Sequence, residues 1–506
     1  MSGSNLFTKQ TLLFATSPIE IPISTITDAE FGILKLIAVS GQLNQDMCQE
    51  FVFTVDCSGS MSDNCSDGRT KMQHIIHTLK NMILYFKENS VQASITIHAF
   101  DHKIYKIIER TFITEENYAG IITKIDQITP RGSTDIEKAL ESSKEMIMRI
   151  KSEFPTHNIS HIFMTDGEVT AGNGNPDVLS EIVDRSVTNA FIGFGIQHDT
   201  VLLNTLGSGK NSGYYFVDKL ENCGLVYGEI LHSILYKLLD DVVISVENGL
   251  IYDFKNNSWV ETLYVGQIAY ENDKIYHIAS SRAEDCVVTF SGKNIGGDLA
   301  DVLFVVTTSR EQEEDLTKYM YRQRTLEYLY KANDYLKRKN SLHINNRDDL
   351  FMFAEQNVTE SFKEEEKSLK EELKTFIAEM KQYMSDKGLT NDGFMKNLCD
   401  DIYICYKTLG NRFGAMYVAA RQTSQGSQRA YTVRHTPDDD DNNFIDNSNY
   451  VNNNNTIWLQ RGSISNNNDP DELHHELSHF SEAPYVTPTS AGLMRDISCG
   501  SEIEEP

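Results

Sequence analysis

The hydrophobic pattern divides the chain into regions with different periods. Over residues 46–240, short apolar runs alternate with stretches in which apolar residues recur every three to four positions. The short runs predict buried strands, and the longer stretches predict amphipathic helices. This alternation predicts an α/β fold with a doubly wound, mostly parallel sheet and helices on both faces. The predicted strands are 51–55, 91–100, 159–165, 190–194 and 214–217, and the predicted helices are 71–87, 136–150 and 225–239.

A different pattern follows at residues 241–310, where apolar and polar positions alternate with a period of two. Gly, Asn and Asp turns separate the runs, as in an antiparallel β module. The N-terminal runs 19–23 and 32–40 have the same character. We therefore expect residues 1–45 to pair with the module into one β-sandwich. The module's own predicted strands are 242–246, 262–265, 286–290 and 302–306.

Residues 311–436 form a helical region followed by a basic linker, and the helical pattern covers 311–420, with apolar residues on one stripe and Lys and Glu between them. Two interpretations stand: a coiled coil that binds a partner, or an intramolecular helical hairpin packed against the β module. The heptad run is short, which favours the hairpin. The polar, basic segment 421–434 is interpreted as a solvated linker, with a docking strand or a phosphorylated segment as alternatives.

The tail, residues 437–506, is acidic and rich in Asn. Because it contains too little apolar surface to offset the entropy of ordering, it is predicted to be disordered. Apolar residues interrupt it at 484–488 and 493–497. They represent either a short linear motif or chance.

Charge and composition restrict the kinds of partner. The formal net charge of −27 disfavours nucleic acid and anionic lipid, which would be repelled, and favours basic partners. The eight cysteines show no paired metal spacing. Residues 1–17 contain only a short apolar run, and no run reaches the ~18 residues of a membrane span. We expect no membrane span and a cytoplasmic or otherwise intracellular location, which includes a viral protein in host cytoplasm; the oligomeric state stays open.

The most specific chemical signal follows the first predicted strand. Asp56, Ser58 and Ser60 lie on alternate positions, so their side chains can converge above one edge of the sheet, while Gly59 permits a tight turn between them. Two further segments supply oxygen ligands: Thr134 lies in a loop before a predicted helix, and Asp166 ends a second predicted strand. An all-oxygen set with few charges suits Mg²⁺ or Mn²⁺.

These residues resemble a known motif. D-x-S-x-S, then G-S-T-D, then T-D-G-E, in this order, resemble the metal-ion-dependent adhesion site of von Willebrand factor A domains, over about residues 46–240. The resemblance implies that Ser58, Ser60 and Thr134 bind the ion directly and that Asp56 and Asp166 act through water. It also implies that an Asp or Glu of a partner protein fills the sixth position. The alternative for D-x-S-x-S alone is a chance polar turn.

The chain departs from that family by an insertion at residues 62–69. Its acidic residues, Asp63 and Asp67, are interpreted either as solvated loop residues or as charges lying over the metal face. Cys57, inside the metal loop, is interpreted as a small filler rather than a nucleophile.

One feature of the tail favours an enzyme. His475, Glu476 and His479 match H-E-x-x-H, in which two imidazoles hold zinc and the Glu acts as general base of a peptidase. Glu502 follows at a separation along the sequence that suits a third ligand. The acidic, Asn-rich surroundings provide no rigid support for such a site and argue against it.

The function favoured by the sequence is non-enzymatic. We expect a Mg²⁺-dependent protein-binding module in an intracellular scaffold or adaptor. One alternative is an adaptor subunit of an ATPase or of a ubiquitin-linked assembly, and a second is the zinc metallopeptidase.

Overall fold

The computed structural model describes most of the chain, with gaps. The ranges described are 6–15, 29–41, 43, 47–65, 67–195, 198–217, 222–294, 301–309, 314–345, 352–411, 414–430 and 484–499. Within the described helices, none is long and apolar enough to cross a membrane. The sequence motif around His475 lies outside these ranges.

A six-stranded sheet forms the centre of the first domain, in the order β5-β4-β3-β6-β7-β8. All neighbours pair in parallel except β4 and β5, which are antiparallel. The predicted α/β fold class is thereby confirmed. The strands are β3 (Gln49–Asp56), β4 (Ala93–Phe100), β5 (Ile104–Phe112), β6 (Asn158–Thr165), β7 (Thr188–Phe194) and β8 (Ser212–Val217).

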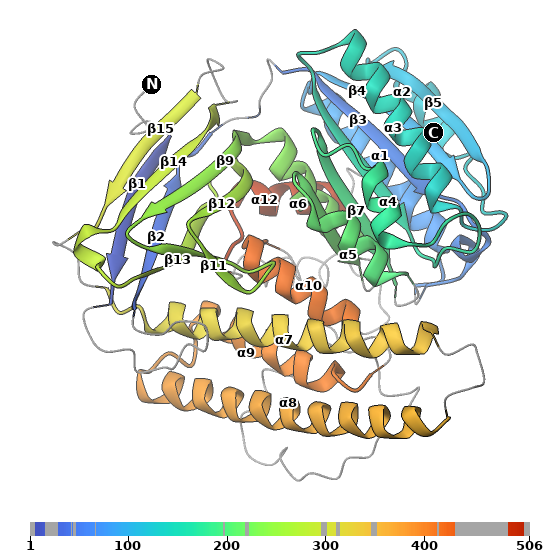
Figure 1. Cartoon of the computed structure of the whole chain (residues 1–506). Helices are drawn as coiled ribbons and strands as arrows, with labels where there is room; N and C mark the ends of the chain where they lie inside the picture. Colours follow the sequence, from blue (N-terminus) through green and yellow to red (C-terminus); the bar gives the residue numbers. More distant parts are fainter. Residues whose placement is uncertain are drawn as a thin grey trace.

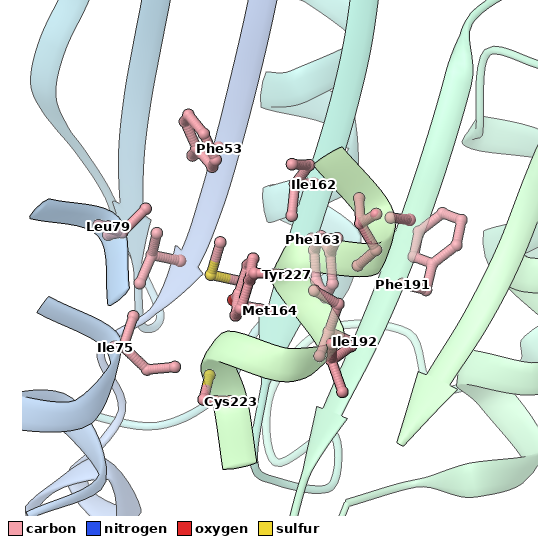
Figure 2. Close-up of a cluster of buried hydrophobic side chains, with 14 of the residues drawn as sticks. Phe53, Ile75, Leu79, Ile162, Phe163, Met164, Phe191, Ile192, Cys223 and Tyr227 are labelled. Carbon is pink, nitrogen blue, oxygen red and sulfur yellow. The ribbon is translucent and has the colours of Figure 1, made fainter. Parts of the chain in front are cut away.

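Helices cover both faces of this sheet (Figure 1). Strand β3 shows why, because its residues point alternately to opposite sides. Phe53 belongs to the buried cluster that includes Leu79 and Tyr227 (Figure 2), whereas Val52 belongs to a separate cluster with Ile147. The helices are α1 (Lys71–Glu88), α2 (Tyr118–Ile125), α3 (Ile136–Glu153), α4 (Pro176–Ile182), α5 (Thr200–Ser208) and α6 (Cys223–Leu235).

Helix α6 is shorter than predicted. The sequence pattern extended it to residue 239, but the helix ends at Leu235 and strand β9 begins at Lys237. Leu238 and Leu239 are buried in the core of the next domain. Tertiary burial there overrides a helical pattern that continues past the helix end.

A β-sandwich of two sheets follows, with orders β1-β2-β13-β10-β11 and β12-β9-β14-β15. The N-terminal strand β2 pairs with β13 along eight residues, from Glu30 to Ile37. Strand β1 was not predicted, and run 19–23 lies outside the described residues. The strands are β1 (Phe7–Phe14), β2 (Glu30–Ala38), β9 (Lys237–Glu247), β10 (Leu250–Asp253), β11 (Ser258–Val260), β12 (Thr262–Ala269), β13 (Asp273–Ser280), β14 (Val287–Asn294) and β15 (Asp301–Thr307).

A layer of helices lies beneath the sandwich (Figure 1). Their apolar stripes meet in one core that also includes Leu13, Phe31 and Ile33 of the sandwich, so the stripes are used within the chain. The linker interpretation of 421–434 is wrong for its first half, because Arg421 is buried in helix α10 and pairs with Asp401. The helices are α7 (Thr317–Asn345), α8 (Met352–Asp386), α9 (Gly393–Thr408) and α10 (Gly414–Ser427).

Part of the tail also departs from the prediction of disorder. Residues 488–499 form helix α12 (Pro488–Cys499), which packs on α6 and α1. Leu493, Met494 and Ile497 are buried. Gly228 of α6 allows this approach, since a Cβ there would lie 2.5 Å from the Met494 Cα. The apolar residues of 493–497 were therefore a docking face, and burial against α6 offsets the entropy of ordering.

Candidate metal site

Parallel pairing brings the two predicted carboxylates to the same edge of the sheet. Strand β3 ends at Asp56 and its neighbour β6 ends at Thr165, and Val55 pairs with Met164 in the ladder. Asp56 and Asp166 are both fully buried. Their position beyond the carboxyl ends of the strands is where open α/β sheets bind ligands.

The turn after β3 arranges the two serines around Asp166. The backbone N–H of Ser58 donates to Asp56 Oδ1 at 2.7 Å, which fixes the start of the turn. Ser58 Oγ lies 3.1 Å from Ser60 Oγ, and Ser60 Oγ donates to Asp166 Oδ1 at 2.8 Å. The backbone N–H of Gly59 donates to the Gly132 carbonyl at 3.1 Å, so the first loop is fastened to the second.

Thr134 comes from that second loop, just before α3. Its backbone N–H donates to Thr170 Oγ1 at 2.8 Å, and its carbonyl accepts from the N–H groups of Thr170 and Ala171. A Cβ on Gly167 would lie 3.5 Å from Thr134 Oγ1 and 3.8 Å from Ser60 Oγ. Both hydroxyls therefore border the same small space, and the structure brings together Asp56, Ser58, Ser60, Thr134 and Asp166.

The donor set fits a hard divalent cation. Adjacent oxygens around an octahedral Mg²⁺ lie about 3.0 Å apart, because each is about 2.1 Å from the ion. The Ser58–Ser60 oxygen pair, at 3.1 Å, matches this spacing, while Asp166 Oδ1 accepts a hydrogen bond from Ser60 Oγ at 2.8 Å. Gly167 leaves open the space that a larger residue would fill. Ser60 is only half-buried and Gly59 is exposed, so the site opens to solvent on this side.

The buried carboxylates have an electrostatic cost. Burial raises the pKa of Asp56 from 3.8 to about 6, and the nearby Asp166 charge adds to this. Hydrogen bonds from Thr165 Oγ1, at 2.5 Å, and from Ser58 lower the pKa in opposition. A divalent cation would relieve the repulsion between the two carboxylates.

One contributor to the site, Lys71, was not predicted from the sequence. Its ammonium donates to Asp166 Oδ2 at 2.6 Å and to Asp63 Oδ2 at 3.3 Å. Burial lowers its pKa, but the contacts with Asp166 and Asp63 outweigh this and hold the pKa above its ordinary value. Lys71 is the first residue of α1, behind the N-cap Thr70. Because a cation is disfavoured at a helix N-terminus, a lysine there was the signal available in the sequence.

Several residues of the inserted loop contact this lysine or its helix. Asp63 pairs with Lys71 although its side chain is 56% exposed, and Asp67 accepts from His74 Nε2 at 3.1 Å when that nitrogen is protonated. Asn64 bridges to Thr70 at the base of the loop. Asp63 is therefore the inserted acidic residue linked to the metal site, through Lys71.

The surroundings of Cys57 argue against a nucleophilic role. It is fully buried, and burial raises the pKa of its thiol to about 12, so the thiolate is absent at neutral pH. Across the described ranges, no group of three His, Cys, Asp or Glu side chains has the arrangement of a metal site. His475, Glu476, His479 and Glu502 fall outside those ranges.

Comparison with known proteins relates the first domain to a family. The family model of the von Willebrand factor type A domain matches residues 50–226. The mouse inter alpha-trypsin inhibitor, heavy chain 4, is 25% identical over 185 residues, which are 35% of this chain and 18% of that protein. The match thus spans less than a fifth of the relative's length.

Solved structures resemble the chain over longer stretches at low identity. A von Willebrand factor type A protein from Catenulispora acidiphila is 13% identical, with a TM-score of 0.45, and covers 66% of this chain and 83% of its own. The ArnB paralog VWA2 from Sulfolobus acidocaldarius is 11% identical, with a TM-score of 0.47, over 84% of this chain and 99% of its own. The mussel byssus proximal thread matrix protein 1 "with zinc occupied MIDAS motif" is 19% identical, with a TM-score of 0.29, over 37% of this chain and 44% of its own.

The parallel sheet, the order of its elements and the family match agree. This chain therefore contains a von Willebrand factor type A domain, a domain that is typically a metal-dependent protein-binding module.

Proposed function

We propose that the chain is a non-enzymatic, Mg²⁺-dependent protein-binding module of an intracellular scaffold or adaptor. The observation that carries the proposal is the convergence of three hydroxyls and two carboxylates at one edge of the sheet, with an opening to solvent beside Ser60. Mn²⁺ has the same preference for oxygen ligands and is expected to substitute for Mg²⁺.

Each residue has a part in this function. Ser58, Ser60 and Thr134 present neutral oxygens, and Asp56 and Asp166 supply the negative charge behind them. A divalent cation held there supplies an electrophilic position that a carboxylate can occupy. Neutral first ligands leave the cation with much of its charge, so a partner's Asp or Glu is attracted to the open side.

The charge of the whole chain further restricts the kind of partner surface that is favoured. At a net charge of −27, the chain repels proteins with an acidic surface and attracts those with a basic one. The partner proposed is therefore an Asp or Glu side chain set in a basic surface. The net charge affects the rate at which the chain meets a partner, and the proposed metal site recognises the partner's carboxylate.

A peptide-selection experiment tests this proposal. The full chain is panned against a displayed random peptide library in Mg²⁺, and bound peptides are eluted with EDTA. We expect the eluted peptides to share an Asp or Glu, and changing it to Asn or Gln should abolish binding.

The variant Thr134→Ala should lose this capture, while Thr123→Ala, on the exposed face of α2, should retain it. Peptides that bind equally in EDTA, or that bind Thr134→Ala as well as the unchanged chain, would contradict the proposal.

A further inference from the structure

Lys71 occupies an unusual position beside the proposed metal site. Its ammonium lies 2.6 Å from Asp166 Oδ2, while Asp166 Oδ1 accepts from Ser60. Asp166 is fully buried and the Lys71 side chain is only 14% exposed. A charged group of the chain thus sits against the carboxylate that the proposed cation would use.

The same ammonium has a second carboxylate within reach. Asp63 Oδ2, in the inserted loop, lies 3.3 Å from Lys71 Nζ, on the solvent side. The four-carbon stem of lysine is flexible, and its ammonium makes its contacts as a point charge rather than through a fixed fork. Lys71 can therefore keep a carboxylate partner when its contact with Asp166 weakens.

We propose that Lys71 is an internal cation that competes with the divalent cation for Asp166, and that Asp63 receives Lys71 when the divalent cation binds. Without metal, Lys71 offsets the charge of Asp166 and stabilises the folded chain. When the metal is bound, the Lys71 ammonium lies close to the divalent cation, and the repulsion between the two positive charges lowers the metal affinity. This inference rests on the proposed function and assigns to the insertion a role in setting the metal affinity.

Calorimetric titration of the full chain with Mg²⁺ tests the inference. Lys71→Met removes the charge and keeps the stem, and it should bind Mg²⁺ at least tenfold more tightly than the unchanged chain. The matched control is Lys80→Met, in the same helix, whose ammonium pairs with Asp126 at 3.1 Å. Lys80→Met should leave the affinity within twofold.

Thermal unfolding supplies a second readout that needs no partner. Lys71→Met leaves Asp166 buried without its cation, so in EDTA it should melt at a lower temperature than the unchanged chain. Mg²⁺ should then raise its melting temperature by more than it raises that of the unchanged chain, since tighter binding stabilises the folded state more.

A pair of loop variants keeps the test decisive if Lys71→Met does not fold. Asp63→Asn and Asp67→Asn remove the same charge from the same loop, but only Asp63 contacts Lys71. Asp63→Asn should weaken Mg²⁺ binding severalfold more than Asp67→Asn, because Lys71 is then left with Asp166 alone.

The outcomes separate this inference from the proposed function. Equal or weaker Mg²⁺ binding by folded Lys71→Met, or equal effects of Asp63→Asn and Asp67→Asn, would overturn the competition while the metal site stands. Absence of Mg²⁺ binding by the unchanged chain and by Lys71→Met alike would overturn the metal site itself and the competition with it.

Discussion

Replacing Asp56 by Asn should make the metal-free chain more stable and remove its metal site at the same time. Asn has the same shape as Asp without the charge. Its Oδ1 can still accept from the Ser58 N–H, and its Nδ2 can donate to Thr165 Oγ1, which in the native chain donates to Asp56. The substitution therefore removes a buried charge and keeps a hydrogen bond to each partner, with its direction reversed at Thr165.

The size of the gain follows from the pKa of Asp56. Burial raises this pKa from 3.8 to about 6, so the folded chain holds the neutral carboxyl more strongly than the unfolded chain does. Above pH 6 the carboxylate is ionised in both folded and unfolded chains, and the folded chain carries the full penalty. One pH unit between the two pKa values corresponds to about 1.4 kcal/mol, so the penalty is about 3 kcal/mol. Below pH 3.8 both states are protonated and the penalty is absent.

Chemical denaturation in EDTA at several pH values measures this effect. Asp56→Asn should raise the free energy of unfolding by about 3 kcal/mol at pH 7.5, and the gain should shrink as the pH falls from 6 towards 4. With Mg²⁺ present, the unchanged chain should gain stability and Asp56→Asn should not.

The control is Asp126→Asn, a change of the same kind at an exposed carboxylate that pairs with Lys80. It should change stability by under about 1 kcal/mol, as expected for a surface ion pair. A loss of stability in Asp56→Asn at pH 7.5, or a gain that does not depend on pH, would refute the reasoning.

Three other predictions follow from the structure and the sequence. Gly228→Ala should displace α12, because its Cβ would lie 2.5 Å from the Met494 Cα, and faster hydrogen exchange over 488–499 would show the release. Arg421→Met should lower the free energy of unfolding by about 3–5 kcal/mol in urea denaturation, because it leaves the buried Asp401 carboxylate without the guanidinium. Glu476→Gln should leave Mg²⁺-dependent peptide capture unchanged; zinc at one equivalent and a peptide cleavage lost in this variant would favour the peptidase instead.

The parts of the site that could be predicted are those set by local spacing. Asp56 ends β3 and Asp166 directly follows β6, so parallel pairing alone brings these two carboxylates to one edge. Ser58 and Ser60 follow within four residues, in the turn and the short 3-10 helix Gly59–Ser62 after β3. Lys71 could not be placed in this way. Its contact with Asp166 depends on how the inserted loop folds back from Met61 to Thr70, and no periodicity describes that path.

The parts of the fold that escaped prediction depend on distant partners. Strand β1 is ordered by its pairing with β2. Helix α12 is ordered by packing against α6, where Gly228 leaves room for the backbone of Met494. In each case the segment alone has a weak pattern, and the burial that orders it comes from residues far away in the sequence. The helical pattern of 421–427 was similarly obscured by its polar residues, such as Arg421, whose partner Asp401 lies on α9.

The way the von Willebrand factor type A domain is attached leaves the proposed metal site away from the chain connections. The chain enters the domain at Gln49, the first residue of β3, and leaves it where α6 passes into β9. Lys237, at that exit, contacts Asn158, the first residue of β6, so both attachments lie at the amino edge of the parallel strands. Asp56 lies at the other end of β3, and eight residues of extended strand span about 25 Å. Since the sandwich is fastened at one edge of the sheet and the oxygens converge at the opposite edge, a partner can reach the site without displacing the connections that hold the domain.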